Sequence, residues 1–292
     1  MKWFSVLLCI SCLLSCEKNI NFKLKVAPSV LVVDASIENN QPPIVVLSKS
    51  FAYFSKISPQ DLDTSFVHNA LVTVTDGAQT IPLKEFEIDS SAGLRFFYYT
   101  VDSLNGLPAM LGQLQNSYRL KIVTGGQEYD ATTTIPALAD KMDSLWWKPT
   151  PFATDTTEVN VTVQITDPPG LGNYVRYFTK TDSSRFLPGA QSVNNDELID
   201  GTTFEVIVPP GIDRNNPVKA AKNYFHRGDT VTIKLSDIDR NTYEFWLTME
   251  FAYQSIGNPF ASPNTVLGNV SNGALGAFCG YASSFKTLVI PR

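Results

Sequence analysis

Apolar and polar residues alternate over short segments along most of the chain, a pattern typical of β-strands with one buried face. The clearest segments are Ala70 to Thr75, Ser117 to Val123 and Glu158 to Thr166. Asp76-Gly77 and Gly125-Gly126 follow two of them, and such pairs favour tight hairpin turns. The pattern therefore predicts a mainly β protein that contains antiparallel hairpins.

The predicted strands fall into two groups on either side of Pro136 to Asp140, so we expect two β-sandwich-like domains. Residues 27–136 predict an Ig-like or transthyretin-like sandwich, and residues 137–292 predict a second β-rich domain. Residues 51–66 and 181–202 are predicted to be polar loops. The expected strands are 30–33, 36–37, 44–47, 70–75, 80–86, 94–101, 117–123, 128–135, 142–148, 158–166, 173–180, 204–208, 230–235 and 287–290.

One segment has the period of a helix. Its large apolar residues recur at spacings of three and four, namely Tyr243, Trp246, Met249, Tyr253 and Ile256. This spacing predicts one amphipathic helix over about 238–256, whose aromatic stripe lies on a sheet. Ser236, with Asp239 three residues on, predicts the N-terminal cap, and Gly257 predicts the C-terminal end.

A short apolar run follows Lys2 and extends from Phe4 to Leu14, which is too short for a bilayer-spanning helix of about 20 residues. It predicts a signal peptide over residues 1–15. The four residues Leu13 to Cys16 resemble a bacterial lipobox. The resemblance implies that Cys16 becomes the first mature residue and carries acyl chains that hold the protein on a lipid bilayer. Residues 16–26 then form a tether. The alternative is a cleaved, soluble secreted protein.

The charge balance limits the classes of partner. The chain has 23 basic and 28 acidic side chains, a net charge of −5. A nucleic-acid-binding protein needs a basic surface, so we expect no nucleic-acid partner. Electrostatic attachment to anionic lipid headgroups is disfavoured for the same reason.

The cysteine count leaves no disulfide in the fold. Cys9 and Cys12 lie in the predicted signal peptide and Cys16 is the lipid-attachment residue, so Cys279 has no partner. A lone cysteine between Phe278 and Gly280 is expected to be a small buried hydrophobe. A nucleophilic role for Cys279 is the alternative.

No motif for metal or cofactor binding is found. His68 and His226 are far apart, and neither has a zinc-type neighbour. The pairs Asp61/Asp63 and Asp237/Asp239 offer carboxylates for calcium, but neither lies in a glycine-bearing acidic loop. We therefore expect no catalytic, cofactor or metal site.

Two further features have a structural and a functional interpretation. Arg227-Gly228-Asp229 is expected to be a turn before a strand, and adhesion through this tripeptide is the alternative. Phe96 to Tyr99 and the pair Trp146 and Trp147 place aromatic rings on both faces of their strands. We expect one ring of each neighbouring pair in the core, and exposed rings that bind a sugar or a partner are the alternative.

Several segments together resemble a family of Bacteroidota lipoproteins known only as a domain of unknown function. The matching segments are Leu31-Val32-Val33 with Pro42-Pro43, Ala70 to Asp76, Tyr118 to Ile122 with Tyr129 and Thr132 to Pro136, Gly228 to Val231, Tyr243 to Trp246, Asn258 to Pro263, and Leu275 to Tyr281. Members are often encoded beside TonB-dependent outer-membrane receptors. The resemblance implies a setting in nutrient uptake and no catalytic residues.

These observations predict a non-enzymatic accessory lipoprotein of the outer membrane that partners a TonB-dependent transporter. The first alternative is a surface module that binds a ligand or glycan, or mediates adhesion. The second is a hydrolase with two inward carboxylates in one cleft. Glu17 directly after Cys16 slightly favours the cell surface over the periplasmic face.

Overall fold

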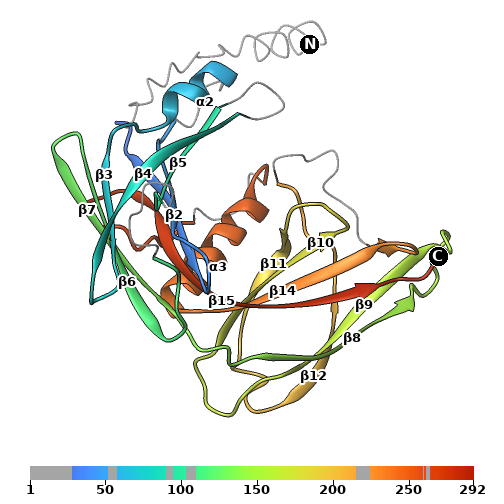
Figure 1. The fold of residues 1–292 in the computed structure, drawn as a ribbon. Coiled ribbons are helices and arrows are strands. Elements are labelled where there is room, and N and C mark those ends of the chain that lie inside the picture. Colours follow the sequence, from blue (N-terminus) through green and yellow to red (C-terminus); the bar gives the residue numbers. More distant parts are fainter. Residues whose placement is uncertain are drawn as a thin grey trace, which may run out of the picture.

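The computed structural model describes residues 28–51, 58–89, 95–102, 110–214, 224–258, 260 and 264–292. Strands make up most of this part of the chain and two helices accompany them (Figure 1), which confirms the prediction of a mainly β protein. None of the helices in these ranges has the length and apolar character needed to cross a membrane. Cys16 and the predicted tether lie outside the described residues.

The first half of the chain forms a run of antiparallel strands in the order β1-β2-β5-β4-β3-β6-β7. Alternate residues of β1 and β6 are buried, as the period of two predicts, and they form one core with the inward residues of β2 and β3. The elements are β1 (Leu31–Glu38), β2 (Ile44–Lys49), α2 (Pro59–Ser65), β3 (Leu71–Thr75), β4 (Thr80–Asp89), β5 (Arg95–Thr100), β6 (Asn116–Thr124) and β7 (Gln127–Ile135).

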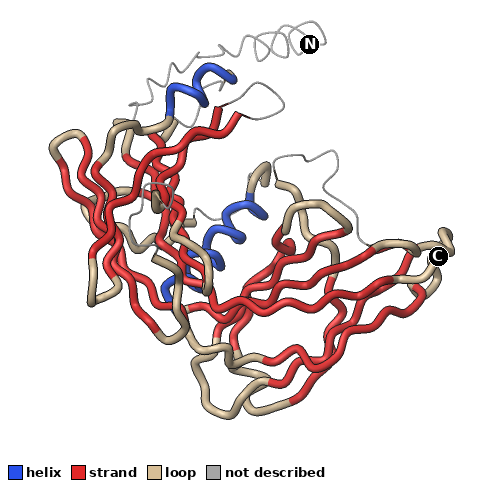
Figure 2. Tube along the Cα trace, viewed as in Figure 1, coloured by secondary structure: helices blue, strands red, loops and turns tan. Residues whose placement is uncertain are grey.

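The second half forms two layers of strands. One layer continues the long sheet in the order β11-β10-β14-β15, and the other contains β12, β9, β13 and β8 (Figure 2). A second apolar core lies between these layers. The elements are β8 (Lys141–Pro149), β9 (Glu158–Thr166), β10 (Tyr174–Thr181), β11 (Leu187–Asn195), β12 (Thr203–Val208), β13 (Phe225–His226), β14 (Thr230–Ile238), α3 (Arg240–Ser255) and β15 (Leu275–Val289).

β15 joins the two halves. Its first residues pair in parallel with β1, and Val33 lies opposite Gly276. Its later residues pair antiparallel with β14. Phe278 and Ala282 of β15 are buried in the core of the first half. β15 therefore contributes to the core of the first half although it lies beyond residue 136, and a single sheet runs from one half to the other.

The helix predicted at 238–256 is α3, but its N-terminal cap differs from the prediction. Asp239 is the capping residue, because its carboxylate accepts a hydrogen bond from the backbone N–H of Thr242. Ser236 lies instead in β14, buried, with its hydroxyl bonded to that of Ser283. Asp237 and Ile238 extend β14 up to the cap, so the helix starts later than predicted.

The aromatic stripe of α3 lies on the sheet only in its first half. Tyr243, Trp246 and Met249 pack against a third core formed with β11 and β15. Tyr253 is 43% exposed and Ile256 is 76% exposed, so the C-terminal part of the stripe faces solvent. Gly257 has a positive φ of 81°, in agreement with the predicted helix end.

Three other predictions are corrected. The polar segment 181–202 contains the edge strand β11, and the polar segment 51–66 contains the short helix α2. α2 is started by a capping box between Ser58 and Asp61. The final strand covers Leu275–Val289 instead of 287–290. Its first part is rich in small residues, which allow it to fit between neighbouring backbones.

Candidate functional site

A cavity of about 530 Å³ lies between the two layers of the second half. β11 ends the long sheet and β12 ends the smaller one, so the two layers are not joined by hydrogen bonds at this edge. The walls come from inward residues of β9, β10, β12 and β14. They include Val163, Ile165, Val175, Tyr177, Phe204, Val206, Ile233 and Leu235.

The rim of this cavity is also apolar. Leu198 is 96% exposed and Ile207 is 57% exposed, and both line the cavity. Exposed apolar groups next to an apolar hollow are typical of a binding surface, because a ligand removes them from water. Strand alternation produces the apolar walls, since every second residue of an open two-layer structure points inward.

Asp140 brings a carboxyl group to this cavity. Its partner is Asp237 of β14, whose Oδ1 accepts hydrogen bonds from the backbone N–H groups of Ala139 (3.2 Å) and Asp140 (3.0 Å). Burial, together with the charge of Asp237, raises the pKa of Asp140 to about 8. Two carboxyl groups this close in a buried site do not both ionise readily, so the raised pKa favours the protonated form of Asp140 at neutral pH.

Three more aspartates lie beside this pair. Carboxylate oxygens of Asp167, Asp196 and Asp200 lie within 4.8 Å of one another. Asp167 follows β9, and Asp196 and Asp200 follow β11, so the ends of two strands bring them together. The charges of Asp167 and Asp196 contribute to the raised pKa of Asp140, after burial and Asp237. We call these five residues the aspartate cluster.

Backbone N–H groups hold the carboxylates of the cluster. Gly201 donates to Asp167 Oδ2 (2.8 Å), and Gly170 donates to Asp200 Oδ1 (2.6 Å). Asp196 Oδ2 accepts from Gly172 and Asn173, both at 2.9 Å. These bonds fix the orientation of all three side chains.

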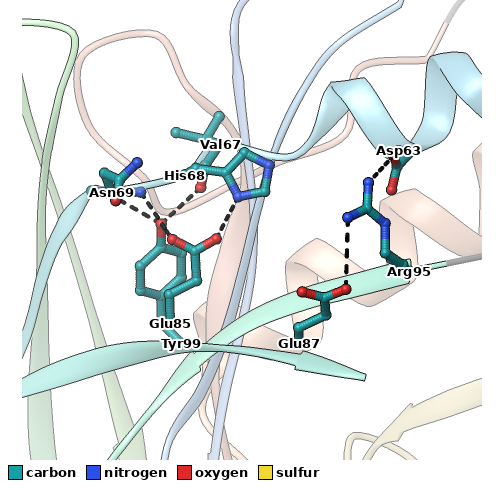
Figure 3. Close-up of polar contacts among 9 residues, drawn as sticks. Asp63, Val67, His68, Asn69, Glu85, Glu87, Arg95 and Tyr99 are labelled. Carbon is teal, nitrogen blue, oxygen red and sulfur yellow. Dashed lines mark hydrogen bonds and ion pairs between the residues drawn. The ribbon is translucent and has the colours of Figure 1, made fainter. Parts of the chain in front are cut away.

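A second polar cluster lies on the β4–β5 hairpin (Figure 3). Glu85 accepts hydrogen bonds from Asn69 N (2.9 Å) and Tyr99 Oη (3.0 Å) and pairs with His68 Nδ1. Burial opposes ionisation of Glu85, but the bonds from Asn69, His68 and Tyr99 outweigh it and lower the pKa of Glu85. The Tyr99 hydroxyl also lies 2.8 Å from Val67 O, so its one proton is shared between Val67 O and Glu85. The cluster attaches residues 67–70 to the hairpin, a structural role.

Other sequence-predicted candidates serve the fold. Asp61 belongs to the α2 capping box, and Asp63 pairs with Arg95 at 2.6 Å (Figure 3). Asp237 and Asp239 diverge, because Asp239 caps α3 while Asp237 faces Asp140. The predicted turn at Arg227-Gly228-Asp229 is confirmed, with φ of 92° at Gly228.

Cys279 is buried, as predicted for a small hydrophobe, and is 3% exposed. Burial raises the pKa of its thiol to about 12, so the thiolate needed for nucleophilic attack does not form near neutral pH.

The aromatic pairs follow the strand period only in part. Tyr99 is buried, whereas Phe96 is 50% exposed. Trp146 and Trp147 are both half-buried, so neither tryptophan is a fully buried core residue. Trp147 packs beside the second core with the Arg227 guanidinium 4.7 Å from its ring centre.

The aspartate cluster and the cavity were not anticipated from the sequence. The five aspartates come from four segments, and no spacing pattern links them. Two of them directly precede a turn with glycine or proline, Asp167 before Pro168-Pro169-Gly170 and Asp200 before Gly201, which is the one local signal of a loop built around carboxylates.

The chain was compared with known proteins. A search of curated proteins finds no match. The model of one family, described as a domain of unknown function (DUF4249), matches residues 17–287. This match covers nearly the whole chain, and the protein therefore belongs to the DUF4249 family.

Proposed function

We propose that the protein is a lipid-anchored, non-enzymatic binding protein of the outer membrane that holds an apolar small molecule and works with a TonB-dependent transporter. The observation that carries the binding role is the cavity of about 530 Å³ between β9, β12 and β10, β11, β14. Its size lies in the range of about 300–1,000 Å³ that is usual for small-molecule sites.

The lining indicates the chemistry of the ligand. Aliphatic and aromatic side chains form most of the walls, while Asp140, Gln191, Asn194 and Asn195 add polar groups. Such a lining suits an apolar molecule with one hydrogen-bonding end. The aspartate cluster beside the cavity disfavours an anionic ligand, because like charges repel in a site of low polarity.

The binding role is favoured over catalysis by the nature of the lining groups. Neither His68 nor His226 lines the cavity, and the thiol of Cys279 is buried elsewhere. Asp140 and Asp237 are both buried, and the backbone N–H groups of Ala139 and Asp140 hold Asp237 Oδ1, so we assign this pair a structural role.

The anchoring role is supported by the lipobox Leu13 to Cys16 and by the family match, which begins at residue 17, directly after Cys16. The transporter partnership is supported by the resemblance to lipoproteins encoded beside TonB-dependent receptors. A tethered binding protein would raise the local concentration of a ligand next to a receptor in the same membrane.

Binding in the cavity is testable with the neutral apolar dye N-phenyl-1-naphthylamine, whose fluorescence rises in an apolar site. We expect the wild type to bind the dye. Val206→Trp should raise the dissociation constant of the dye at least about tenfold, a loss of about 1.4 kcal/mol in binding free energy. Val206 lies on β12 and lines the cavity, so an indole at this position occupies ligand volume.

Val289→Trp is the matched control, because Val289 is 67% exposed on β15 and does not line the cavity. It should bind the dye like the wild type. Equal affinities of all three proteins, or no binding by the wild type, would contradict the binding role.

Anchoring is testable in cells with Cys16→Ala. We expect the wild type to incorporate a palmitate analogue and to sediment with membranes, and the variant to lose both properties, because a lipid anchor supplies the affinity for the bilayer. The wild type extracted in mild detergent should co-purify an outer-membrane barrel protein. Label in the Cys16→Ala variant would refute lipidation at Cys16, and purification without a barrel protein would refute the partnership.

A further inference from the structure

The aspartate cluster has a charge that the described residues do not neutralise. Four of its members are almost completely buried: Asp140 (6% exposed), Asp167 (2%), Asp196 (3%) and Asp237 (3%). None of the ion pairs between described residues involves any of the five aspartates. Buried carboxylates are normally paired with a cation, because desolvation of an isolated charge is costly.

Asp140 and Asp237 face each other, whereas the other three aspartates form a separate group that includes Asp167. Asp167 is the key residue. Its Oδ2 accepts the bond from Gly201, whereas Oδ1 is buried and has no hydrogen-bond partner among the described residues. Asp63, Asp140 and Asp237 also have a buried oxygen without a hydrogen-bond partner in the described part of the chain, but Asp167 differs because its carboxylate lies against those of Asp196 and Asp200, where a cation would satisfy it.

We propose that Asp167, Asp196 and Asp200 bind a Ca²⁺ ion beside the cavity. Calcium prefers oxygen ligands at about 2.3–2.6 Å, so two oxygens on opposite sides of one ion lie up to about 5 Å apart. The carboxylate oxygens lie within 4.8 Å of one another, which fits this range. Mg²⁺ usually keeps several waters and takes only one or two carboxylates, so a set of three carboxylates favours Ca²⁺.

The surrounding structure favours a preformed site. Backbone N–H groups of Gly170, Gly172 and Gly201 orient the three carboxylates before any ion arrives. Asp200 is exposed, whereas Asp167 and Asp196 are buried, so the ion has a path from solvent past Asp200.

A second acidic group is a weaker candidate. Asp155, Glu158 and His226 also bring ligand atoms within 4.8 Å of one another. Asp155 is exposed and accepts two bonds from Thr157, and none of its side-chain oxygens is buried without a partner. This group therefore lacks the orphaned oxygen that marks the Asp167 site.

The calcium site has a structural consequence for the cavity. Asp196 and Asp200 lie in the segment that also carries Leu198 and Ile199, which line the cavity. A bound ion links this segment to the end of β9 at Asp167. Calcium is therefore expected to hold one wall of the cavity in place, although ion binding itself does not depend on the proposed apolar ligand.

The test uses the full-length protein, purified in detergent and stripped with a chelator. Isothermal titration with Ca²⁺ alone should give a dissociation constant below about 1 mM, the upper range for extracellular calcium modules. Asp167→Asn and Asp200→Asn should each raise the dissociation constant for Ca²⁺ at least about tenfold, because each removes one negative charge from the ligands. Ca²⁺ should also raise the melting temperature of the wild type.

Glu197→Gln is the matched control, since Glu197 lies exposed in the same segment and its change removes the same charge. It should bind Ca²⁺ like the wild type. Asp200 is exposed, so Asp200→Asn is a usable site variant even where Asp167→Asn does not fold.

Three outcomes would overturn the proposal. They are no binding by the wild type at about 1 mM Ca²⁺, an equal loss in Glu197→Gln and Asp200→Asn, and Mg²⁺ binding at least as tight as Ca²⁺ binding. Failure of the dye experiment alone would leave the calcium site intact, and loss of calcium binding alone would leave the dye site intact.

Discussion

Replacement of Gly276 by alanine is expected to lower the free energy of unfolding by about 4 kcal/mol, near the top of the range for single substitutions. Gly276 has a φ of 94°, a conformation that strains any residue with a Cβ. A Cβ at this position would also lie 1.9 Å from the carbonyl oxygen of Val33. The two strands would have to separate at the point where β15 joins β1.

Gly273→Ala separates the two causes. Gly273 also has a positive φ, of 74°, but a Cβ there would meet no atom within 4 Å. It should therefore cost only the backbone strain, about 1–2 kcal/mol. Urea denaturation measures both variants through the midpoint and slope. Equal midpoints for Gly273→Ala and Gly276→Ala would show that the close approach of β15 to Val33 does not exist in solution.

The parts of the fold that were predictable are those with local signals. The hairpin between β6 and β7 was found because Gly125 and Gly126 supply two positive φ angles, of 57° and 75°, between alternating strands. The turn at Asp76 was found for a similar reason, and its carboxylate accepts bonds from Ala78 N and Gln79 N. Each signal lies within a few residues of the turn that it specifies.

The missed elements depend on contacts between distant residues. β11 is polar because it is an edge strand, so its side chains do not alternate in the way that a buried strand requires. The first part of β15 contains small residues that resemble a loop. Gly280 shows why small residues are needed in this part of β15. A Cβ at this position would lie 2.5 Å from the carbonyl oxygen of Thr134 on β7. The packing of β15 against β7 selects small residues, and a single sequence does not display that constraint.

The aspartate cluster was missed for the same physical reason. Its carboxyl groups meet only after β8, β9, β11 and β14 have formed. Acidic pairs close in the chain are separated by the fold: Asp61 caps α2 and Asp63 pairs with Arg95, while Asp239 caps α3 and Asp237 joins the aspartate cluster. A carboxylate near a strand end has many structural uses, so its partners determine its role.

Asp239→Ala is expected to lower the free energy of unfolding by about 3 kcal/mol, because one carboxylate serves two structures. Its Oδ1 caps α3 by accepting from Thr242 N at 2.8 Å, an interaction worth about 1 kcal/mol. Its Oδ2 accepts from Thr133 Oγ1 (2.9 Å) and Thr134 N (2.7 Å) of β7, and such bonds to a charged group contribute about 1.5–3 kcal/mol. The residue thus attaches the start of α3 to the first half of the protein.

Asp239→Asn distinguishes the two roles. The amide oxygen still caps α3, but the amide NH₂ cannot accept a hydrogen bond from Thr134 N, so we expect about half of the loss. Glu244→Gln is the control on the same helix, and it removes only the exposed pair with Arg240, which is worth less than about 1 kcal/mol. Urea denaturation should rank the variants in this order. If Asp239→Asn were as stable as the wild type, the hydrogen bonds from Thr133 and Thr134 of β7 to Asp239 would contribute nothing to the stability of the protein.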